Sequence, residues 1–387
     1  MVFGRDGKYA IDERVTMRDG GQSVLQSGTK MVLVRLAWAG AVLLSLVGVV
    51  TLDFLRHGGQ FRDLPAATPL ACDTLKLGAS AEDIQFDRAR SVAFLSSFDR
   101  RALIEGRASE GDVLQLELPT TIDAAPAAPS TALVAKPAGF RPHGMSLYRM
   151  GDGALRLFVI SHLPDGGHSV EIFEQRATDR LFVPVRSVRD PLLRSPNAIV
   201  AVGHEQFYVA NDSGAEGPID RFSELVLRRG LSQLVYFDGK EMTVAAQGLA
   251  SAVGLGISPD GTRLYASETL GKRLAVYERN AGTALLTRLA DIPVDGAPDN
   301  INIGADGVVW LAVHGRTLDL VRHFGDAAHA APSWIQRLDS AAPDAKLETV
   351  FFDPGTRLSA GSVGAVHEGR LLMGSITERK MLSCRLN

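Results

Sequence analysis

The sequence predicts an all-β protein, a six-bladed β-propeller preceded by one N-terminal transmembrane or signal-anchor helix. Six times along the chain a turn-forming cluster runs directly into a short apolar strand, and the strand centres lie near residues 93, 157, 208, 264, 310 and 371. A fairly regular spacing of this size in a strand-rich chain fits one four-stranded sheet per repeat. Six such sheets close into a ring around a central channel, where loops from the inner strands meet.

Composition supports one large globular unit of this kind. Apolar residues make up 45% of the 387 residues, and the strands alternate with period two, as in residues 263–267. Without the N-terminal region that precedes Cys72, the remaining length suits a single closed propeller. The net charge of −3 and the absence of a long basic run argue against nucleic acid as the main partner.

The N-terminal region contains an uncharged apolar run over residues 36–52. This run reaches the short limit for a membrane helix, and no small-residue cleavage site follows closely. We therefore predict a retained signal anchor rather than a cleaved signal. The expected organisation is a polar tail over 1–30, the anchor helix over 31–55, a linker over 56–71 and the propeller over 72–387.

Basic residues slightly favour an orientation with the N-terminus inside. Arg18, Lys30 and Arg35 precede the apolar run, against Arg56 and Arg62 after it. We expect a membrane-anchored protein with an extracytoplasmic propeller, either periplasmic or extracellular.

The two cysteines, Cys72 and Cys384, lie at the two ends of the predicted propeller. Propellers commonly close by pairing the N-terminal strand with the last blade, and a disulfide between these residues would fix that closure. In the chain-entropy model a bond that closes so long a loop stabilises the fold substantially, and it requires an oxidising compartment. Two free buried thiols are the alternative.

Several common catalytic motifs are absent from the sequence. It has no G-x-S-x-G elbow, no H-E-x-x-H pair, no phosphate-binding glycine loop and no C-x-x-C pair. The usual serine hydrolase, zinc protease, nucleotide enzyme and thiol redox functions therefore lack support.

Polar clusters nevertheless lie beside strands of different predicted blades. Their carboxylate, amide and imidazole groups belong to Glu82, Asp83, His143, His162, Asn197, Asp299 and Asn300. Oxygen ligands brought together in one channel suit Ca²⁺, which takes six to eight of them. Taken singly, each of these residues is more often a turn former, a solvated charge or a satisfied histidine.

Longer stretches carry a family resemblance. PHGMSLY, SHLPDGGHSVEIF, NAIVAVGHEQFYVAND, GLGISPDGTRLYASE, PDNINI and the ending GAVHEGRLLMGSITERKMLSCRLN occur in an order and spacing similar to the serum paraoxonase/arylesterase family. The resemblance covers most of the chain, from Cys72 to Cys384. It implies a six-bladed propeller that hydrolyses lactones and aryl esters, with two calcium ions in its channel. It also implies a retained hydrophobic N-terminal segment and one disulfide.

The resemblance assigns the catalytic calcium to four residues of this chain: Glu82, Asn197, Asp299 and Asn300. The family supplies a further Asn from the fourth blade, and here Val253 stands at that place. Valine has no side-chain oxygen, so water would have to fill the fifth position.

A second, structural calcium would use Asp83 and the main-chain carbonyl of Met145. The family's other carboxylate follows the Asn directly, and here that residue is Ala198. We therefore expect one catalytic ion, and weak binding or none at the second site.

The resemblance also assigns a proton-transfer role to His143 and His162, whose separation along the chain agrees with the family pattern. One would act as a base toward water and the other as its partner, a role that suits imidazole near neutral pH. The metal would polarise the substrate carbonyl. His168, His204 and His314 are further candidates by residue type alone.

These features predict a calcium-dependent hydrolase of lactones and aryl esters, acting on a small-molecule substrate by water attack assisted by the histidine pair. A first alternative is a non-catalytic propeller that binds a ligand or a partner protein, because Val253 and Ala198 depart from the ligand pattern. A second is a sugar-lactone hydrolase that uses Mn²⁺ or Zn²⁺ at the reduced oxygen site.

Overall fold

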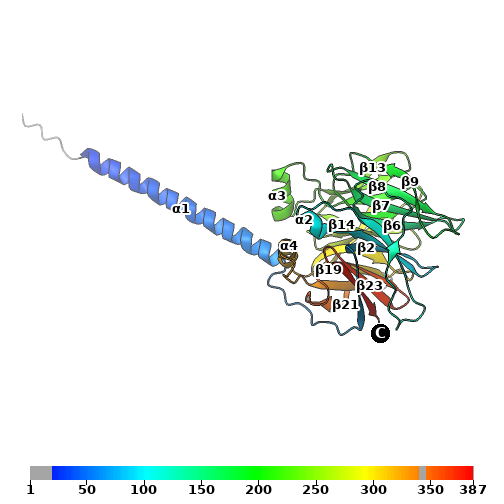
Figure 1. The fold of residues 1–387 in the computed structure, drawn as a ribbon. Helices are drawn as coiled ribbons and strands as arrows, with labels where there is room; N and C mark the ends of the chain where they lie inside the picture. Colours follow the sequence, from blue (N-terminus) through cyan, green and yellow to red (C-terminus); the bar gives the residue numbers. More distant parts are fainter. Residues whose placement is uncertain (1–19, 340–345, 387) are drawn as a thin grey trace, which may run out of the picture. The chain divides into compact units, whose positions relative to one another are not determined.

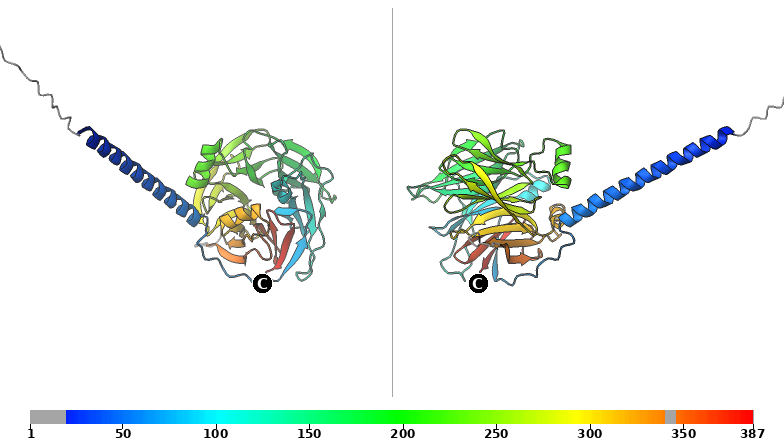
Figure 2. Two further views of the ribbon diagram at one scale, coloured as in Figure 1. Left: turned by 60° about the vertical axis from the view of Figure 1, so that its left-hand side comes forward. Right: turned by 180° about the vertical axis from the view of Figure 1, so that it is seen from behind.

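The computed structural model describes residues 20–339 and 346–386. Within these residues the chain forms six four-stranded antiparallel sheets after one long N-terminal helix. The left view in Figure 2 shows the sheets arranged around a circle like the blades of a propeller. The predicted fold class is confirmed.

The first strand of each blade lines the channel, because the strands that contact the neighbouring blades across the centre are β2, β6, β10, β14, β18 and β22. The first three blades contain, from the channel outward, β2 (Ser80–Asp87), β3 (Val92–Phe98), β4 (Asp112–Glu117) and β5 (Ser130–Thr131); β6 (Pro142–Arg149), β7 (Leu155–His162), β8 (His168–Gln175) and β9 (Val183–Val188); β10 (Pro196–Ala201), β11 (Phe207–Asn211), β12 (Ser232–Phe237) and β13 (Met242–Leu249). The last three contain β14 (Ala252–Ile257), β15 (Arg263–Glu268), β16 (Arg273–Arg279) and β17 (Leu286–Pro293); β18 (Ala297–Ile303), β19 (Val309–His314), β20 (Ser333–Leu338) and β21 (Glu348–Asp353); β22 (Gly361–His367), β23 (Arg370–Ser375), β24 (Lys380–Arg385) and β1 (Cys72–Lys76).

Each of the six repeats found in the sequence corresponds to the second strand of a blade. The predicted centres fall in β3, β7, β11, β15, β19 and β23. The turn-forming cluster before each centre is the hairpin that joins the inner strand to the second strand, which explains why the signal recurs once per blade.

The ring closes through the predicted pairing of the chain's ends. β1 pairs antiparallel with β24, and the pair begins at Cys72 opposite Cys384. These two cysteines form a disulfide, as predicted. The preceding segment also lies against the propeller, since Arg357 donates hydrogen bonds to the main-chain oxygens of Thr68 and Leu70.

The N-terminal helix α1 spans Gly20–His57. Its part from Met31 to His57 has a mean hydropathy of 2.1 and is the one described helix long and apolar enough to cross a membrane. The described chain forms two compact units that divide at Leu55, and the second unit contains the propeller. Residues 1–19 of the predicted polar tail lie outside the described residues.

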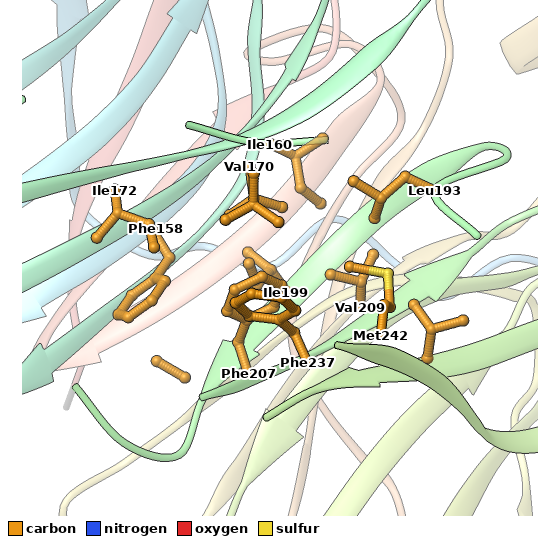
Figure 3. Packing of buried hydrophobic residues seen from close by; sticks show 13 residues of the cluster. Phe158, Ile160, Val170, Ile172, Leu193, Ile199, Phe207, Val209, Phe237 and Met242 are labelled. Carbon is orange, nitrogen blue, oxygen red and sulfur yellow. The ribbon is translucent and has the colours of Figure 1, made fainter. Parts of the chain in front are cut away.

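Adjacent blades pack through apolar side chains that alternate along the strands. Figure 3 shows the cluster between the second and third blades, where Phe158 and Val170 face Ile199, Phe207 and neighbouring residues. Comparable clusters join the other blades, so each sheet buries both of its faces. This packing fixes the inner strands around the channel.

Three short helices follow the second strands of alternate blades: α2 (Arg100–Ile104), α3 (Pro218–Leu227) and α4 (Thr317–Gly325). Figure 1 shows them at the same end of the propeller. The apolar residues Phe222 and Leu225 of α3 are exposed. The inner strands begin at this end, so the helices surround the channel mouth.

Candidate functional site

Every inner strand has a β-bulge near its start. The pairing register shifts between Ala81 and Ile84, Pro142 and Met145, Pro196 and Ala198, Ala252 and Gly254, Pro298 and Ile301, and Gly361 and Val363. Bulges redirect side chains and are common beside active sites. Here they form one ring, which we call the bulge ring.

The bulge ring contains most of the residues singled out in the sequence. Its members are Glu82 and Asp83, His143 and Gly144, Asn197, Val253, Asp299 and Asn300, and Ser362. Met145 ends one bulge, and His162 ends the strand paired with it. Separate segments of the chain thus deliver the predicted residues to one level of the channel.

Direct contacts hold neighbouring members of the bulge ring together. Asn300 Nδ2 and Ser362 Oγ both donate to the main-chain oxygen of Glu82, at 3.0 Å each. Gly144 approaches so closely that a Cβ there would lie 2.3 Å from the main-chain oxygen of Asn197. Bare backbone is therefore required where these two blades meet.

His143 forms the centre of a hydrogen-bonded row. Its Nε2 lies 2.9 Å from Glu82 Oε1, and its Nδ1 lies 2.6 Å from His162 Nε2. His162 Nδ1 in turn lies 2.9 Å from His168 Nδ1. The predicted pair is thus in direct contact, and a third imidazole extends it.

Arg100 adds a positive charge to the site. Its guanidinium forms an ion pair with Glu82 Oε2. Burial alone would raise the pKa of Glu82, but the charges of Arg100 and His143 outweigh burial and lower the pKa to about 2. Glu82 is therefore ionised at neutral pH.

His162 and Asp83 have perturbed pKa values with a common cause. Burial, with smaller contributions from His143 and Arg100, lowers the pKa of His162 to about 2. Burial also raises the pKa of Asp83 to about 6, against hydrogen bonds from the main-chain N–H groups of Met145 and Ile84. Low solvation at the bulge ring thus favours the neutral form of both groups.

Asn197 presents an unused oxygen. Its Nδ2 donates to Asp212 Oδ2 at 3.3 Å, and Asp212 also accepts a hydrogen bond from Ser195 Oγ. Asn197 Oδ1 is buried and has no hydrogen-bond partner among the described residues. A buried amide oxygen that accepts no hydrogen bond is energetically costly. Such an oxygen is typical of a position that contacts a bound ligand or ion.

Asp299 pairs with a histidine of the next strand. Asp299 Oδ2 lies 2.8 Å from His314 Nε2, and both side chains are buried. The main-chain oxygen of Asp299 accepts from Ser267 Oγ at 2.7 Å, which fixes this bulge against the fourth blade. Of the three additional histidines named from the sequence, His168 and His314 thus contact the site; His204 is exposed, and its main-chain oxygen accepts from Arg156.

Sequence reasoning did not identify Arg100 or Asp212. Arg100 begins a five-residue helix with no recognisable pattern, and Asp212 follows a strand like many turn residues. A signal for His168 did exist: His162 and His168 flank a Leu-Pro-Asp-Gly-Gly turn. A hairpin turn of this composition places its flanking residues opposite each other, as the strand register shows.

The propeller thus carries a ring of largely buried carboxylate, amide and imidazole groups at its channel mouth. Comparison with known proteins gives the family. The family model described as Arylesterase matches residues 130–386. Serum paraoxonase/arylesterase 1 of Rattus norvegicus is 30% identical over 359 residues, which cover 87% of this chain and 97% of that protein.

Serum paraoxonase/arylesterase 1 of Homo sapiens is 32% identical over 249 residues, which cover 64% of this chain and 69% of that protein. Among solved structures, a luciferin-regenerating enzyme matches with a TM-score of 0.50 and 13% identity, over 81% of this chain and 95% of that one. That likeness concerns the fold alone. The chain belongs to the arylesterase family, and it is an esterase- or lactonase-type hydrolase.

Proposed function

We propose that this protein is a calcium-dependent hydrolase of lactones and aryl esters, in which His143 and His162 assist the attack of water. The observation that carries the proposal is the position of His143, whose two nitrogens contact Glu82 and His162 within the bulge ring. The family membership and the names of the relatives support the substrate class.

The donor chemistry of four residues suits one calcium ion, which would have to displace Arg100 and His143 from the two oxygens of Glu82. The four ligands would be Glu82, Asn197, Asp299 and Asn300, which supply two carboxylates and two amide oxygens. Asn197 Oδ1 has no other partner among the described residues, and the amide nitrogens of Asn197 and Asn300 are already occupied by acceptors. Calcium bound here would polarise the substrate carbonyl and offset the negative charge that develops on its oxygen.

A second ion has weaker support. Asp83 Oδ1 accepts the N–H of Ile84 at 2.7 Å, and Asp83 Oδ2 accepts the N–H of Met145 at 2.6 Å. Protein donors therefore satisfy both oxygens, and Ala198 contributes no carboxylate. We do not include a structural calcium at Asp83 and Met145 in the proposal.

The protein's own groups would handle the proton. His143 Nε2 reaches into the bulge ring, where it contacts Glu82. With calcium in place of His143 on Glu82, this nitrogen would be free to take the proton of the attacking water. His162 holds the other nitrogen of His143 and sets which tautomer is present. Because the pKa of His162 is lowered to about 2, this residue stays neutral at neutral pH. It therefore has no positive charge that would repel a proton gained by His143.

The N-terminal helix supports a membrane location. The span Met31–His57 has the length and hydropathy for an uncleaved anchor. The disulfide between Cys72 and Cys384 favours an oxidising compartment for the propeller. We include a membrane-anchored, extracytoplasmic enzyme in the proposal.

A non-catalytic propeller is the second candidate, favoured by one specific contact. Arg100 occupies an oxygen of Glu82, one of the four proposed ligands, and Val253 supplies none. A fixed guanidinium that replaces the cation would leave a channel suited to binding a ligand without turnover.

Replacing Asp299 distinguishes these functions. Asp299→Ala removes one of two ligand carboxylates, so hydrolysis of phenyl acetate and a δ-lactone is expected to fall on the order of 10²-fold or more. Asp306→Ala is the matched control, because Asp306 is exposed in the turn at the other end of the same strand. A folded Asp299→Ala protein with parental activity would show that the ring is not the active site.

A further inference from the structure

We propose that the propeller binds a small phosphate monoester in a basic cavity that lies between the closing strands β1 and β24 and the helices α2 and α4. The cavity, which we call the closure cavity, has a volume of about 570 Å³. None of its lining residues belongs to the bulge ring, so the proposal does not depend on hydrolytic activity. Its cationic side chains outnumber its carboxylates: Lys76, Arg101, Arg107, Arg379 and Lys380 against Glu105 and Glu378.

Two lysines of the closure cavity face each other across the strand pair that closes the ring. Lys76 ends β1 and Lys380 begins β24, and the two residues are register partners. Like charges directly opposite each other on paired strands repel and weaken the pairing. An anion beside both ammonium groups would offset this repulsion. The register of the closure therefore indicates a place for an anion.

Carboxylates neutralise only part of this charge. Glu378 forms an ion pair with Lys380 at 3.2 Å, and it also accepts the main-chain N–H of Ser359 at 3.1 Å. Lys76 has no ion pair within residues 20–339 and 346–386. The remaining pairs are Arg107 with Glu105 and Arg379 with Asp99. Both of these arginines are exposed, and exposed ion pairs leave much of the local field unchanged.

Arg101 supplies a planar set of donors to the closure cavity. Its guanidinium donates to the main-chain oxygens of His323 and Phe324 at 2.8 and 2.7 Å, which joins α2 to the last turn of α4. These bonds use two of the five N–H groups of a guanidinium. Arg101 is partly buried and forms no ion pair with a carboxylate among the described residues. The position therefore retains both charge and donors for an oxyanion.

Two buried side chains complete the lining without adding charge. His323 Nδ1 lies 2.7 Å from the main-chain oxygen of His329, and its Nε2 lies 2.8 Å from Thr377 Oγ1. Because a carbonyl oxygen only accepts, Nδ1 carries the proton and Nε2 accepts from the hydroxyl of Thr377. Burial lowers the pKa of His323, which keeps the ring neutral at neutral pH. The positive charge of the cavity thus comes from its lysines and arginines.

These features select the class of ligand. A phosphate monoester carries close to two negative charges at neutral pH and three acceptor oxygens, which match two ammonium groups and one guanidinium better than a single carboxylate does. The volume is that of a small-molecule site and exceeds the needs of inorganic phosphate. A small organic substituent can therefore lie along the aliphatic parts of the lysine and arginine side chains.

Binding would also strengthen the closure of the ring. One ligand would contact Lys76 of β1, Lys380 of β24 and Arg101 of the first blade's helix, and so would connect the two ends of the propeller. A ligand that binds only the folded state raises its stability. At a concentration tenfold above the dissociation constant, the midpoint of thermal unfolding should rise by roughly 2 °C.

Isothermal titration of the detergent-solubilised full chain with glycerol 3-phosphate tests the proposal. We expect a dissociation constant below about 1 mM, which increases with added sodium chloride because the contacts are ionic. Phosphatidic acid in mixed detergent micelles is titrated in parallel, since it presents the same chemical group on a lipid. Calorimetry requires no turnover, so a parent protein without esterase activity would end the proposed function and leave this test intact.

Lys76→Glu is the decisive variant. It places a carboxylate opposite Lys380, so an attracting pair replaces a repelling one and the fold should be at least as stable as the parent. The dissociation constant for glycerol 3-phosphate should increase at least about tenfold. Lys240→Glu is the matched control, because it makes the same charge change at an exposed turn of the third blade. This control should bind as the parent does.

Three results would overturn the proposal. Parental affinity in Lys76→Glu would place the phosphate elsewhere, for example at the bulge ring. An equal loss in Lys76→Glu and Lys240→Glu would show attraction to net charge and not a site. Binding of phosphatidic acid without binding of glycerol 3-phosphate would replace the soluble ligand by a lipid headgroup.

Discussion

At the scale of single residues, the composition of the bulge ring determines how tightly it can hold a cation. Val253 lies at the bulge of β14 and is the apolar member at a level otherwise lined by amides, carboxylates, imidazole, hydroxyl and glycine. Arg100 adds a permanent positive charge beside Glu82. At the proposed calcium site both features would lower the affinity, because one removes a ligand oxygen and the other competes for one.

Restoring an oxygen at Val253 should strengthen calcium binding. We expect Val253→Asn to tighten the calcium dissociation constant about tenfold, equivalent to about 1.4 kcal/mol. The activity of the full chain, measured as a function of free calcium, gives this constant directly.

Val253→Leu is the matched control, because leucine has nearly the shape of asparagine without its oxygen. Equal affinity for the Asn and Leu variants would mean that this position does not face the ion, and a gain in neither activity nor affinity would favour the non-catalytic propeller.

At the scale of elements, the site is built by strand irregularity. Each of the six inner strands has one bulge, and the bulges place side chains at one level of the channel. Close backbone contact between neighbouring inner strands then fixes their relative heights. Gly144 and Gly254 are the positions where this contact is closest to ligands.

A side chain at Gly144 should disrupt the ring. The Cβ of Gly144→Ala would lie 2.3 Å from the main-chain oxygen of Asn197 and 2.9 Å from the Cα of Ala198, and both are backbone atoms that cannot rotate away. We expect roughly 1–3 kcal/mol of destabilisation and a weakened calcium site, because Asn197 would move. Urea unfolding and calcium titration measure the two effects.

Gly151→Ala serves as its control, since no atom lies within 4 Å of a Cβ there. If Gly144→Ala were as stable and as active as Gly151→Ala, the close approach of the two inner strands would not position the site.

The sequence predicts the blades better than it predicts the site contacts. Turn clusters and alternating apolar residues reveal the second strands because both are local patterns. Glu82, His143, Asn197 and Asp299 are found through a resemblance over the whole propeller, since a lone polar residue before a strand has no distinguishing local signal. Arg100 escapes prediction because its contact with Glu82 depends on where a short helix places it in space.

At the scale of the whole molecule, the two ends of the propeller are joined twice, by the pairing of β1 with β24 and by the disulfide between Cys72 and Cys384. A propeller needs such closure because each blade is stabilised by its neighbours, and an open ring leaves two apolar sheet faces exposed. Closure also keeps Glu82 of the first blade beside Ser362 of the last, at one level of the channel.

Removing the disulfide should therefore destabilise the propeller as a unit. Cys72→Ser with Cys384→Ser is expected to lower the free energy of unfolding by roughly 2–5 kcal/mol, the usual cost of losing a native disulfide. Urea unfolding of the double variant, compared with the oxidised and the reduced parent, measures this effect. Coincident midpoints for the double variant and the oxidised parent would show that strand pairing alone closes the ring.

We propose that the bulge ring hydrolyses esters with the help of one calcium ion, and the most direct measurement combines metal content with turnover. The detergent-solubilised full chain would be analysed for bound metals, then assayed on phenyl acetate and a δ-lactone before chelation, after chelation and after calcium is returned. We predict about one calcium per chain, loss of turnover on chelation and recovery with calcium but not with magnesium. Turnover that survives complete removal of calcium, or a folded calcium-loaded protein without turnover, would contradict the claim.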